Sequence, residues 1–433
     1  MAKPICNAAM LQTIDQLMQS LGSALGPHAV TADGDSLDTH RIDGVTPRLV
    51  VTPSSVEQVA ATLRLCTKAQ AAVIPWGGGT ALALGNPPRR ADVVIKLHKL
   101  DRVVEHDAAN LTVSAQCGAT LNDLQAAIAA QKQLVPIDAP LPERATIGGI
   151  VAANLNGPRR ACYGGVRDLV IGMKILLADG AQIKAGGKVV KNVAGYDMCK
   201  LFVGSLGTLG IIIEVTLRVA PIAERTATLV GAGDLTQLEN LHEQLLRSAL
   251  APAAVSLVRH GAPEKWRLGV CCEGFDESVE RQLGEIGAMA TRSGINCEIL
   301  TAETHNDFWS PLRDFPLQPE RLIFRVTVPR AKVFDFVKLA DGWQSTAIVG
   351  DTAMGTIWIA CAAQKSGRER FSRLTAAARE RHGHAIVFAA PFALKTGVNV
   401  WGASAPTLSL MREIKHRFDP DALLNPGRFV GNL

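Results

Sequence analysis

The chain has 433 residues, of which 47% are apolar and 20% are charged, a composition typical of a soluble globular protein with about two or three domains. Its 45 basic and 40 acidic residues are scattered and give a formal charge of +5, which is too mild to indicate nucleic-acid binding but suits an anionic ligand. The nine cysteines form no C-x-x-C pair, which predicts a reducing compartment and excludes a cysteine-ligated iron–sulfur cluster of ordinary spacing within this chain.

Two apolar stretches are candidates for a signal peptide or a transmembrane span. The first 26 residues lack the unbroken apolar core of a signal peptide, because Gln12, Thr13 and Asp15 interrupt it, and they are predicted to form an amphipathic helix. Residues 346–363 are the most apolar later window, but Asp351 and two glycines fall within it. This window is predicted to form a pair of buried strands rather than a membrane span.

A predicted β-α-β unit precedes the first glycine-rich loop. Residues 49–52 are a short β-branched run, the pattern S-x-x-E at Ser54 predicts a helix start, and residues 71–76 return to strand character. The loop lies in VIPWGGGTALALGN at residues 73–86. It fails as a Rossmann fingerprint, because the third glycine is missing and no helix of normal length fits before Pro87. We therefore predict a phosphate loop that passes from strand to strand.

Two further glycine-rich segments follow. Thr120 is expected to cap a helix, and in the segment ATIGGIVAANLNGPRRACYGGVRD we expect Thr146 to cap a second, short one. Residues 173–185 are predicted to form a hairpin. The third segment, LFVGSLGTLG from Leu201, runs into a predicted strand with one apolar face.

Glycine serves two purposes at a phosphate site, since it allows a positive φ and lets backbone N–H groups approach an anion closely. Three glycine-rich loops within about 135 residues indicate a long ligand that is contacted at several points, and a dinucleotide fits this description. Each loop taken alone is equally consistent with a tight turn. A nicotinamide dinucleotide is disfavoured, because the loop-to-helix connection of a Rossmann fold is missing.

Several side chains beside these loops have both a functional and a structural interpretation. Arg159, Arg160 and Arg167 are candidates to offset the charge of a pyrophosphate, although arginines in loops are usually solvated. Tyr163 and Tyr196, the chain's two tyrosines, are candidates to pack on a cofactor, although ordinary core packing is the more frequent role.

Four ordered motifs carry a resemblance to a known superfamily. They read PWGGGTALALGN, TIGGIVAANLNGPRRACYGGVRDLVIGMKILLADG, KVVKNVAGYDMCKLFVGSLGTLGIIIEVTLRVAP and FDPDALLNPGRF, and they resemble the FAD-binding domain of the vanillyl-alcohol oxidase superfamily, also called the PCMH type. Within it, VKNVAGYDMCKLFVGS, APFALKTGVNVWG and NPGRF resemble the FAD-binding subunits of bacterial glycolate oxidases. The match covers nearly the whole chain beyond about residue 36.

The resemblance implies an α+β fold, in which a PCMH-type FAD-binding domain of two α+β subdomains is joined to a middle α+β cap domain. The implied divisions are a helical N-terminal extension at residues 1–40, the FAD-binding domain at 41–222, the cap at 223–385 and a C-terminal segment at 386–433 that packs on the FAD-binding domain.

The resemblance also assigns FAD contacts by position, with the first loop holding the pyrophosphate. Relatives that bind the flavin covalently often use a histidine in this loop, and none is present here, so non-covalent FAD is expected. The expected FAD contacts are Trp76, Gly77, Gly78, Gly79, Thr80, Ala81, Pro140, Thr146, Gly148, Gly149, Asn154, Gly157, Gly165, Val166, Asp168, Gly207, Gly210, Ile211 and Ile212.

The sequence departs from the resemblance at the catalytic site. Relatives that oxidise 2-hydroxy acids alone carry an H-x-G-D-G-N-x-H strand and a later E-H-G. The corresponding strand here, VGDTAMGTIWIA from Val349, has no histidine, and the pair His382 and His384 is more typical of surface residues than of metal ligands. The catalytic residues therefore stay unknown, and no metal is expected.

The leading hypothesis is a non-covalent FAD subunit of a complex that oxidises glycolate to glyoxylate. The resemblance implies a catalytic FAD subunit that oxidises the small 2-hydroxy acid and an iron–sulfur subunit that carries electrons toward membrane quinone. We expect a cytoplasmic protein, either free or at the inner face of the cytoplasmic membrane through its complex, with no transmembrane segment and no nucleic acid. The alternatives are a self-sufficient FAD-dependent 2-hydroxy acid or alcohol oxidoreductase and a structural assembly subunit whose FAD never turns over.

Overall fold

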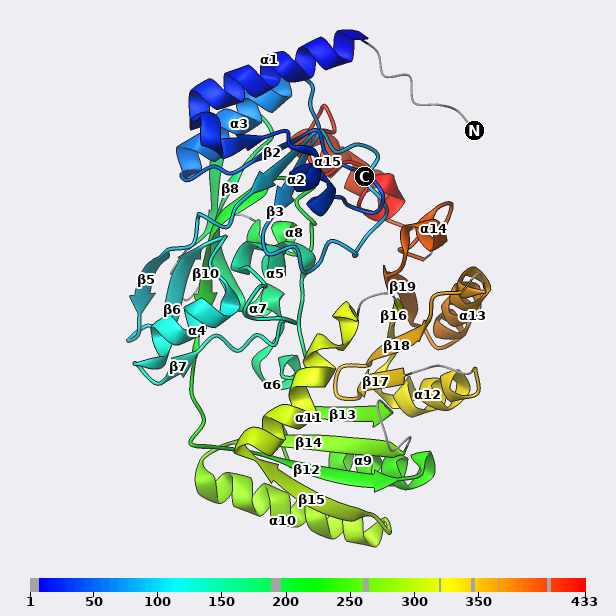
Figure 1. Cartoon of the computed structure of the whole chain (residues 1–433). Helices are drawn as coiled ribbons and strands as arrows, with labels where there is room; N and C mark the ends of the chain where they lie inside the picture. Colours follow the sequence, from blue (N-terminus) through cyan, green and yellow to red (C-terminus); the bar gives the residue numbers. More distant parts are fainter. Residues whose placement is uncertain are drawn as a thin grey trace.

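The computed structural model describes residues 8–187, 196–259, 265–318, 321–343, 347–364, 366–402 and 406–433, with side chains from residue 14 onward. Residues 188–195, which belong to the third motif above, lie outside the described residues. Figure 1 shows one lobe that carries the N-terminal helices and the C-terminal segment, and a second lobe built on the strands β12 to β19.

The first subdomain is a four-stranded sheet in the order β1-β2-β4-β3, in which β2, β4 and β3 are parallel and β1 is antiparallel. Because β1 lies within residues 1–40, the N-terminal stretch contributes an edge strand to this sheet. Helix α3 begins one residue later than the sequence pattern suggests, since the Ser55 hydroxyl accepts the N–H of Gln58. The elements are α1 (Ala8–Leu25), η1 (Pro27–Ala29), β1 (Val30–Thr31), α2 (Gly34–Thr39), β2 (Leu49–Val51), α3 (Val56–Lys68), β3 (Val73–Trp76) and β4 (Val93–Lys96).

The second subdomain is a five-stranded antiparallel sheet in the order β5-β6-β10-β8-β9, with short helices that carry the glycine-rich segments. The predicted hairpin is confirmed by the pairing of β8 with β9, and the third glycine-rich segment follows helix α8 rather than a strand. The elements are β5 (Val103–Asp107), β6 (Thr112–Gln116), α4 (Leu121–Ala129), β7 (Gln133–Leu134), α5 (Ile147–Ala153), α6 (Arg160–Tyr163), α7 (Val166–Leu169), β8 (Val170–Leu176), β9 (Gln182–Gly186), α8 (Cys199–Phe202), β10 (Ile211–Arg218) and β11 (Ala220–Pro221).

The second lobe is an eight-stranded antiparallel sheet in the order β15-β12-β14-β13-β17-β18-β16-β19. Its sequence runs twice through the pattern β-α-β-β-α-β, and the two halves meet where β13 pairs with β17. The elements are β12 (Arg225–Gly233), α9 (Leu235–Arg247), β13 (Ala254–Arg259), β14 (Trp266–Gly274), α10 (Asp276–Arg292), β15 (Asn296–Thr301), α11 (Ala302–Asp314), η2 (Phe315–Leu317), β16 (Arg321–Thr327), η3 (Arg330–Lys332), α12 (Val333–Asp341), β17 (Ala347–Asp351), β18 (Thr356–Ala362), α13 (Gly367–Glu380) and β19 (His384–Ala389).

The two faces of this sheet belong to different cores, because successive strand residues point to opposite sides. On β12, Leu229 packs with residues of α9, α10, α12 and α13, whereas Val230 joins the core that contains α11 and the second subdomain. Phe324 and Ile323 of β16 divide in the same way. One face of the sheet is therefore covered by its own helices, and the other faces the first lobe, the expected FAD-binding domain.

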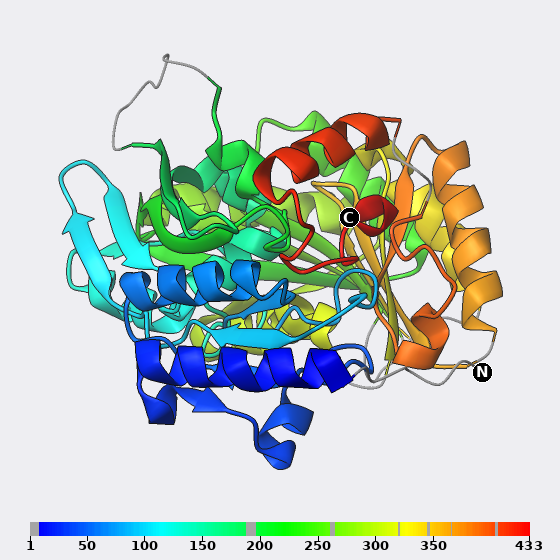
Figure 2. The same ribbon diagram turned by 90° about the horizontal axis from the view of Figure 1, so that it is seen from above.

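The C-terminal segment returns to the first sheet through α14 (Phe392–Lys395), α15 (Leu408–Phe418) and η4 (Val430–Asn432). Val73 of β3 donates to the carbonyl of Leu423 at 2.8 Å and accepts from the N–H of Asn425 at 2.8 Å. Figure 2 shows α15 (red) on the first lobe, across the view from α1 (dark blue). The exact domain divisions given above stay a prediction.

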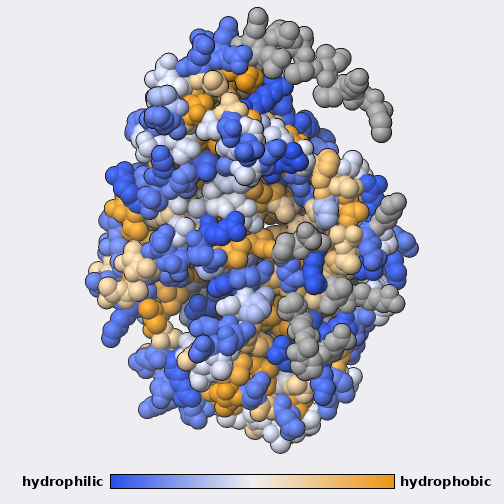
Figure 3. Space-filling view, in the orientation of Figure 1, coloured by the Kyte–Doolittle hydropathy of each residue, from blue (hydrophilic) through white to orange (hydrophobic). Residues whose placement is uncertain are grey.

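The surface of the chain is mixed in character. Figure 3 shows hydrophilic residues (blue) over most of one face, with hydrophobic residues (orange) gathered in its middle and again near its lower end. None of the helices in the described ranges is long and apolar enough to cross a membrane.

Candidate functional site

A cavity with an empty volume of about 830 Å³ lies where the first and second glycine-rich segments and the turn before β10 meet, and we call it the glycine cavity. The C-terminal tail completes its wall with Asn425 and Arg428. The expected FAD contacts that line it are Gly77, Gly78, Gly79, Thr80, Ala81, Thr146, Gly148, Gly149, Gly207, Gly210, Ile211 and Ile212.

The first loop presents a row of free backbone donors to this cavity. From Gly77 through Ala81, none of the five N–H groups donates a hydrogen bond to a residue that the structure describes. Consecutive backbone N–H groups in a loop form a concave site for an anion. The five residues are half-buried, and their N–H groups suit a ligand with several acceptor oxygens.

Several glycines of the wall are required by packing between the loops. A Cβ on Gly78 would overlap the carbonyl of Arg144, and one on Gly77 would overlap the Thr146 hydroxyl. Gly79 has a positive φ of 71°, which favours glycine. A substitution such as Gly78→Asp would therefore disrupt the loop itself, so it is a poor test of ligand charge.

Helix α5 supplies the opposite wall. Its first turn is capped as predicted, since the Thr146 hydroxyl accepts the N–H of Gly149 at 3.4 Å. The small side chains of Ala152 and Ala153 also line the cavity. Cys117 is the cavity's one cysteine among the described residues, and burial raises the pKa of its thiol to about 12, so it is a neutral thiol rather than a nucleophilic thiolate near pH 7.

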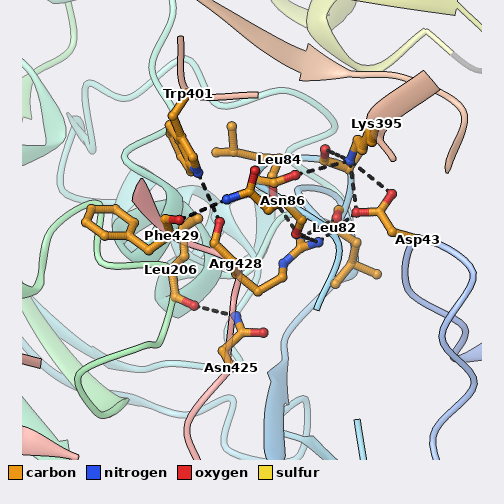
Figure 4. Close-up of polar contacts among 12 residues, drawn as sticks. Asp43, Leu82, Leu84, Asn86, Leu206, Lys395, Trp401, Asn425, Arg428 and Phe429 are labelled. Carbon is orange, nitrogen blue, oxygen red and sulfur yellow. Dashed lines mark hydrogen bonds and ion pairs between the residues drawn. The ribbon is translucent and has the colours of Figure 1, made fainter. Parts of the chain in front are cut away.

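A buried charge cluster fixes the far end of the first loop, as Figure 4 shows. Lys395 and Arg428 both bind the carboxylate of Asp43, at 2.9 and 2.8 Å. Their remaining donors bind backbone carbonyls of the loop: Lys395 those of Ala83 and Gly85, and Arg428 those of Leu82, Leu84 and Asn86. These bonds tie the loop to the C-terminal segment.

The cluster also gives the glycine cavity its charge. Its two cations and one carboxylate sum to +1, and the side chains of Lys395, Arg428 and Asp43 are 0%, 4% and 8% exposed. Arg428 is the one charged residue among the described residues lining the cavity, and no carboxylate is among them. An excess positive charge in a poorly solvated position attracts an anion strongly.

The side-chain oxygen of Asn425 has no hydrogen-bond partner among the described residues. The Nδ2 of Asn425 donates to the carbonyl of Leu206 at 2.6 Å, but its Oδ1 is buried and makes no hydrogen bond to a described residue. A donor on a ligand in the cavity would satisfy this oxygen.

Three more expected contacts line a second cavity, of about 1020 Å³, between the FAD-binding lobe and the cap, and we call it the arginine cavity. These are Pro140, Asn154 and Gly157. Ala153 lines the glycine cavity and Asn154 lines the arginine cavity, so the two spaces adjoin at the end of α5. A long ligand in the first cavity would thus point toward the second.

The last four expected contacts, Trp76, Gly165, Val166 and Asp168, line neither cavity. Trp76 packs on His40 with ring centroids 4.9 Å apart, and the Asp168 carboxylate accepts the N–H of Gly165 at 2.8 Å. These roles are structural, and contact of all nineteen residues with FAD stays a prediction.

The charged and aromatic candidates lie away from the glycine cavity. Arg159 and Tyr163 both bind Glu273 of β14, at 2.9 and 2.7 Å, and so join the FAD-binding lobe to the cap. Tyr196 is 95% exposed, and Arg167 donates to the carbonyl of Lys200. Arg160 lines the arginine cavity.

The sequence did not identify Lys395, Arg428, Arg325 or Asp351 as site residues. Lys395 and Arg428 fell within quoted motifs, but the sequence offers no signal that they meet Asp43, which lies more than 350 positions earlier. Arg325 lies inside a strand of the cap, and Asp351 was noted for interrupting an apolar window.

Comparisons with known proteins identify the cofactor. Residues 47–186 match the family described as "FAD binding domain". The chain is 29% identical over 365 residues to glycolate oxidase subunit GlcE of Escherichia coli, covering 82% of this chain and 92% of that protein. It is 27% identical over 417 residues to glycolate oxidase subunit GlcD of Bacillus subtilis, covering 88% of each. FAD is therefore the cofactor of this chain.

The same fold occurs in solved structures. That of p-cresol methylhydroxylase with substrate bound superposes with a TM-score of 0.75 at 16% identity, covering 96% of each chain. The α+β fold expected from the sequence motifs is confirmed.

Proposed function

We propose that this chain, an FAD-dependent oxidoreductase with a PCMH-type FAD-binding domain, is the non-covalent FAD-binding subunit of a glycolate (2-hydroxy acid) oxidase complex. In such a complex it works with a catalytic FAD subunit and an iron–sulfur subunit in the conversion of glycolate to glyoxylate. Its similarity to two proteins that are each named as a glycolate oxidase subunit supports the proposal.

We infer the position of the cofactor from the row of free N–H groups from Gly77 through Ala81. A pyrophosphate offers acceptor oxygens to these donors, and the net charge of +1 on Asp43, Lys395 and Arg428 partly offsets its two negative charges. The residues present therefore fit FAD, and they hold it through backbone donors.

When bound, FAD supplies the oxidant, since its ring system accepts two electrons from an alcohol carbon. The chain's own residues bind and orient the cofactor. The first loop would hold the anionic part, Arg428 would hold the loop in place, and Asn425 Oδ1 is free to accept one hydrogen bond. Because Cys117 is a neutral thiol and no histidine is among the described residues of the cavity wall, the proposal includes dissociable FAD.

Two measurements on the purified full-length chain test the proposal. Acid precipitation should release FAD into the supernatant at about one per chain, and flavin that stays with the precipitate would show a covalent bond. Glycolate under anaerobic conditions should bleach the flavin absorption of the assembled complex and leave that of the isolated chain unchanged.

A second candidate, a self-sufficient hydroxy acid oxidoreductase, is favoured by the arginine cavity, which holds the buried carboxylate of Asp351 as a potential proton acceptor. Rapid bleaching of the isolated chain's flavin by glycolate or D-lactate would select this candidate over the first.

A further inference from the structure

The arginine cavity is formed by elements from both lobes. The FAD-binding lobe contributes residues from Asn154 to Arg160, and the cap contributes three neighbouring strands, β16, β17 and β18. Residues directly opposite each other in a sheet share a face. Arg325 pairs with Trp358, which pairs with Val349, two residues before Asp351. Arg325 and Asp351 therefore lie on the same face of the sheet, which borders the cavity.

Two arginines of this cavity have no acidic partner. Within the described ranges, neither Arg160 nor Arg325 forms an ion pair, and Arg160 Nε is buried without a hydrogen bond. The guanidinium carbon of Arg325 lies 5.9 Å from the centroid of the Trp358 ring. Burial and the nearby charge of Arg160 lower the pKa of Arg325 to about 10, so the Arg325 guanidinium is still charged at pH 7.

Neighbouring arginines show that this arrangement is unusual in the molecule. Arg159, next in sequence to Arg160, binds Glu273 at 2.9 Å and lies 3.7 Å from Asp138. Arg313, on α11 in the same cavity, binds Asp314 at 2.8 Å. Because a half-buried charge without an ion pair is incompletely compensated, the two guanidiniums together indicate that an anion from outside the chain completes the site.

Two further polar side chains face the same space. Both Nδ2 and Oδ1 of Asn156 are buried without a hydrogen-bond partner among described residues, so this amide is free to bind a hydroxyl group. Asp351 is 6% exposed, and its Oδ1 accepts the N–H of Met354 at 3.2 Å. Burial raises the pKa of Asp351 to about 7, while the charge of Arg160 opposes this rise.

We propose that Arg160 and Arg325 bind the carboxylate of a small hydroxy acid in this cavity, with Asn156 at its hydroxyl group and Asp351 as the residue that takes up a proton when the acid binds. With Asp351 ionised, the two guanidiniums leave the empty site with a net charge of +1, which favours the binding of a monocarboxylate. The class of ligand in this inference rests on the proposed function. The inference goes further, because it places the acid-binding site in this chain.

The test uses 2-hydroxyisobutyrate, which has no hydrogen on its hydroxyl-bearing carbon and so cannot be oxidised to a 2-oxo acid. Isothermal titration of the FAD-loaded chain should show saturable binding. Arg160→Gln and Arg325→Gln should each weaken binding about 30-fold or more, because each removes a charged partner of a poorly solvated anion. Arg247→Gln on the exposed face of α9 is the matched control and should change nothing.

Proton uptake gives a second readout. At pH 7 binding of the acid should take up a fraction of a proton, measured by titration in buffers of different ionisation enthalpy, and Asp351→Asn should abolish this uptake while keeping the binding. Binding that is unaffected by both arginine variants, or inorganic phosphate that competes equally well, would overturn the inference. The FAD content of the wild-type chain and of each variant is measured in parallel. A wild-type chain that holds no FAD would refute the proposed function, whereas intact FAD without acid binding would refute this inference alone.

Discussion

The two cavities offer an anion different kinds of donor. In the glycine cavity, consecutive N–H groups of one loop are the donors, and a paired cluster supplies a net charge of +1 behind them. In the arginine cavity, side chains from distant parts of the chain are the donors, and Arg160 and Arg325 form no ion pair within the described ranges, although the Asp351 carboxylate lines the same cavity. The first arrangement suits a cofactor that stays bound, and the second suits a small anion that comes and goes.

Arg428 is buried and paired, whereas Arg325 is half-buried and forms no ion pair within the described ranges. Arg428→Met should lower the free energy of unfolding by about 3 to 5 kcal/mol, because it leaves the loop carbonyls of Leu82 and Leu84 without donors and removes one partner of Asp43. Urea denaturation measures the effect, with the exposed Arg412→Met as control. FAD affinity should fall as well, and Arg428→Lys should restore part of both. Unchanged stability would show that the cluster does not hold the loop.

The row of N–H groups is tested by adding a carboxylate beside it. Ala81→Asp should weaken FAD binding by roughly 30-fold to 100-fold, because the new anion competes for the same donors and repels the pyrophosphate. Ala81→Ser is the matched neutral control and should bind FAD normally. The measurement is FAD fluorescence during titration of the apoprotein. Equal affinities of the two variants would place the pyrophosphate elsewhere.

The affinity of the arginine cavity for 2-hydroxyisobutyrate should depend on pH through Asp351. This carboxyl is faced by Arg160 on α6, Arg325 on β16, Arg313 on α11 and Asp138. Since its pKa is raised to about 7, Asp351 ionises as the pH rises through 7 and then repels the ligand's carboxylate. Affinity should be highest below pH 7 and fall by up to about tenfold per pH unit above it. Asp351→Asn should remove the decline.

Removing Arg325 should have the smallest effect on the free energy of unfolding, with a sign opposite to that of Arg428→Met. Arg325→Met should leave the free energy of unfolding unchanged or raise it by about 1 kcal/mol, because the half-buried charge that it removes lies near the charge of Arg160 and forms no ion pair within the described ranges. Thermal unfolding without added acid measures this. A loss comparable to that of Arg428→Met would mean that Arg325 is structural.

The same contrast explains what could be predicted from the sequence. Loop residues Gly77 to Ala81 were predictable because a backbone site requires glycines close together in the chain, and Thr120 and Thr146 were predictable because capping is local. Asp351 and Arg325 could not be predicted, since a charged residue in a strand usually indicates exposure. Only the antiparallel register of β16, β18 and β17 brings these two residues to one face.

The wrong or incomplete predictions have similar causes. Arg160 was a candidate for the pyrophosphate because it is near the second glycine-rich segment in sequence, but the fold turns it toward the cap. The cap contains a structural repeat, whose two halves meet at β13 and β17. This repeat was not predicted from the sequence. A β-α-β-β-α-β unit is defined by the order of its elements, and many different hydrophobic patterns satisfy it.

The involvement of Arg428 has a consequence for biosynthesis. The wall of the glycine cavity contains Ile42 and Arg428, which lie 386 positions apart in the sequence. The carbonyl groups of Leu82 and Asn86 lack their partner until Arg428 has been synthesised and has packed against the loop. The wall of the cavity is therefore complete only after the C-terminal segment has folded onto the first sheet.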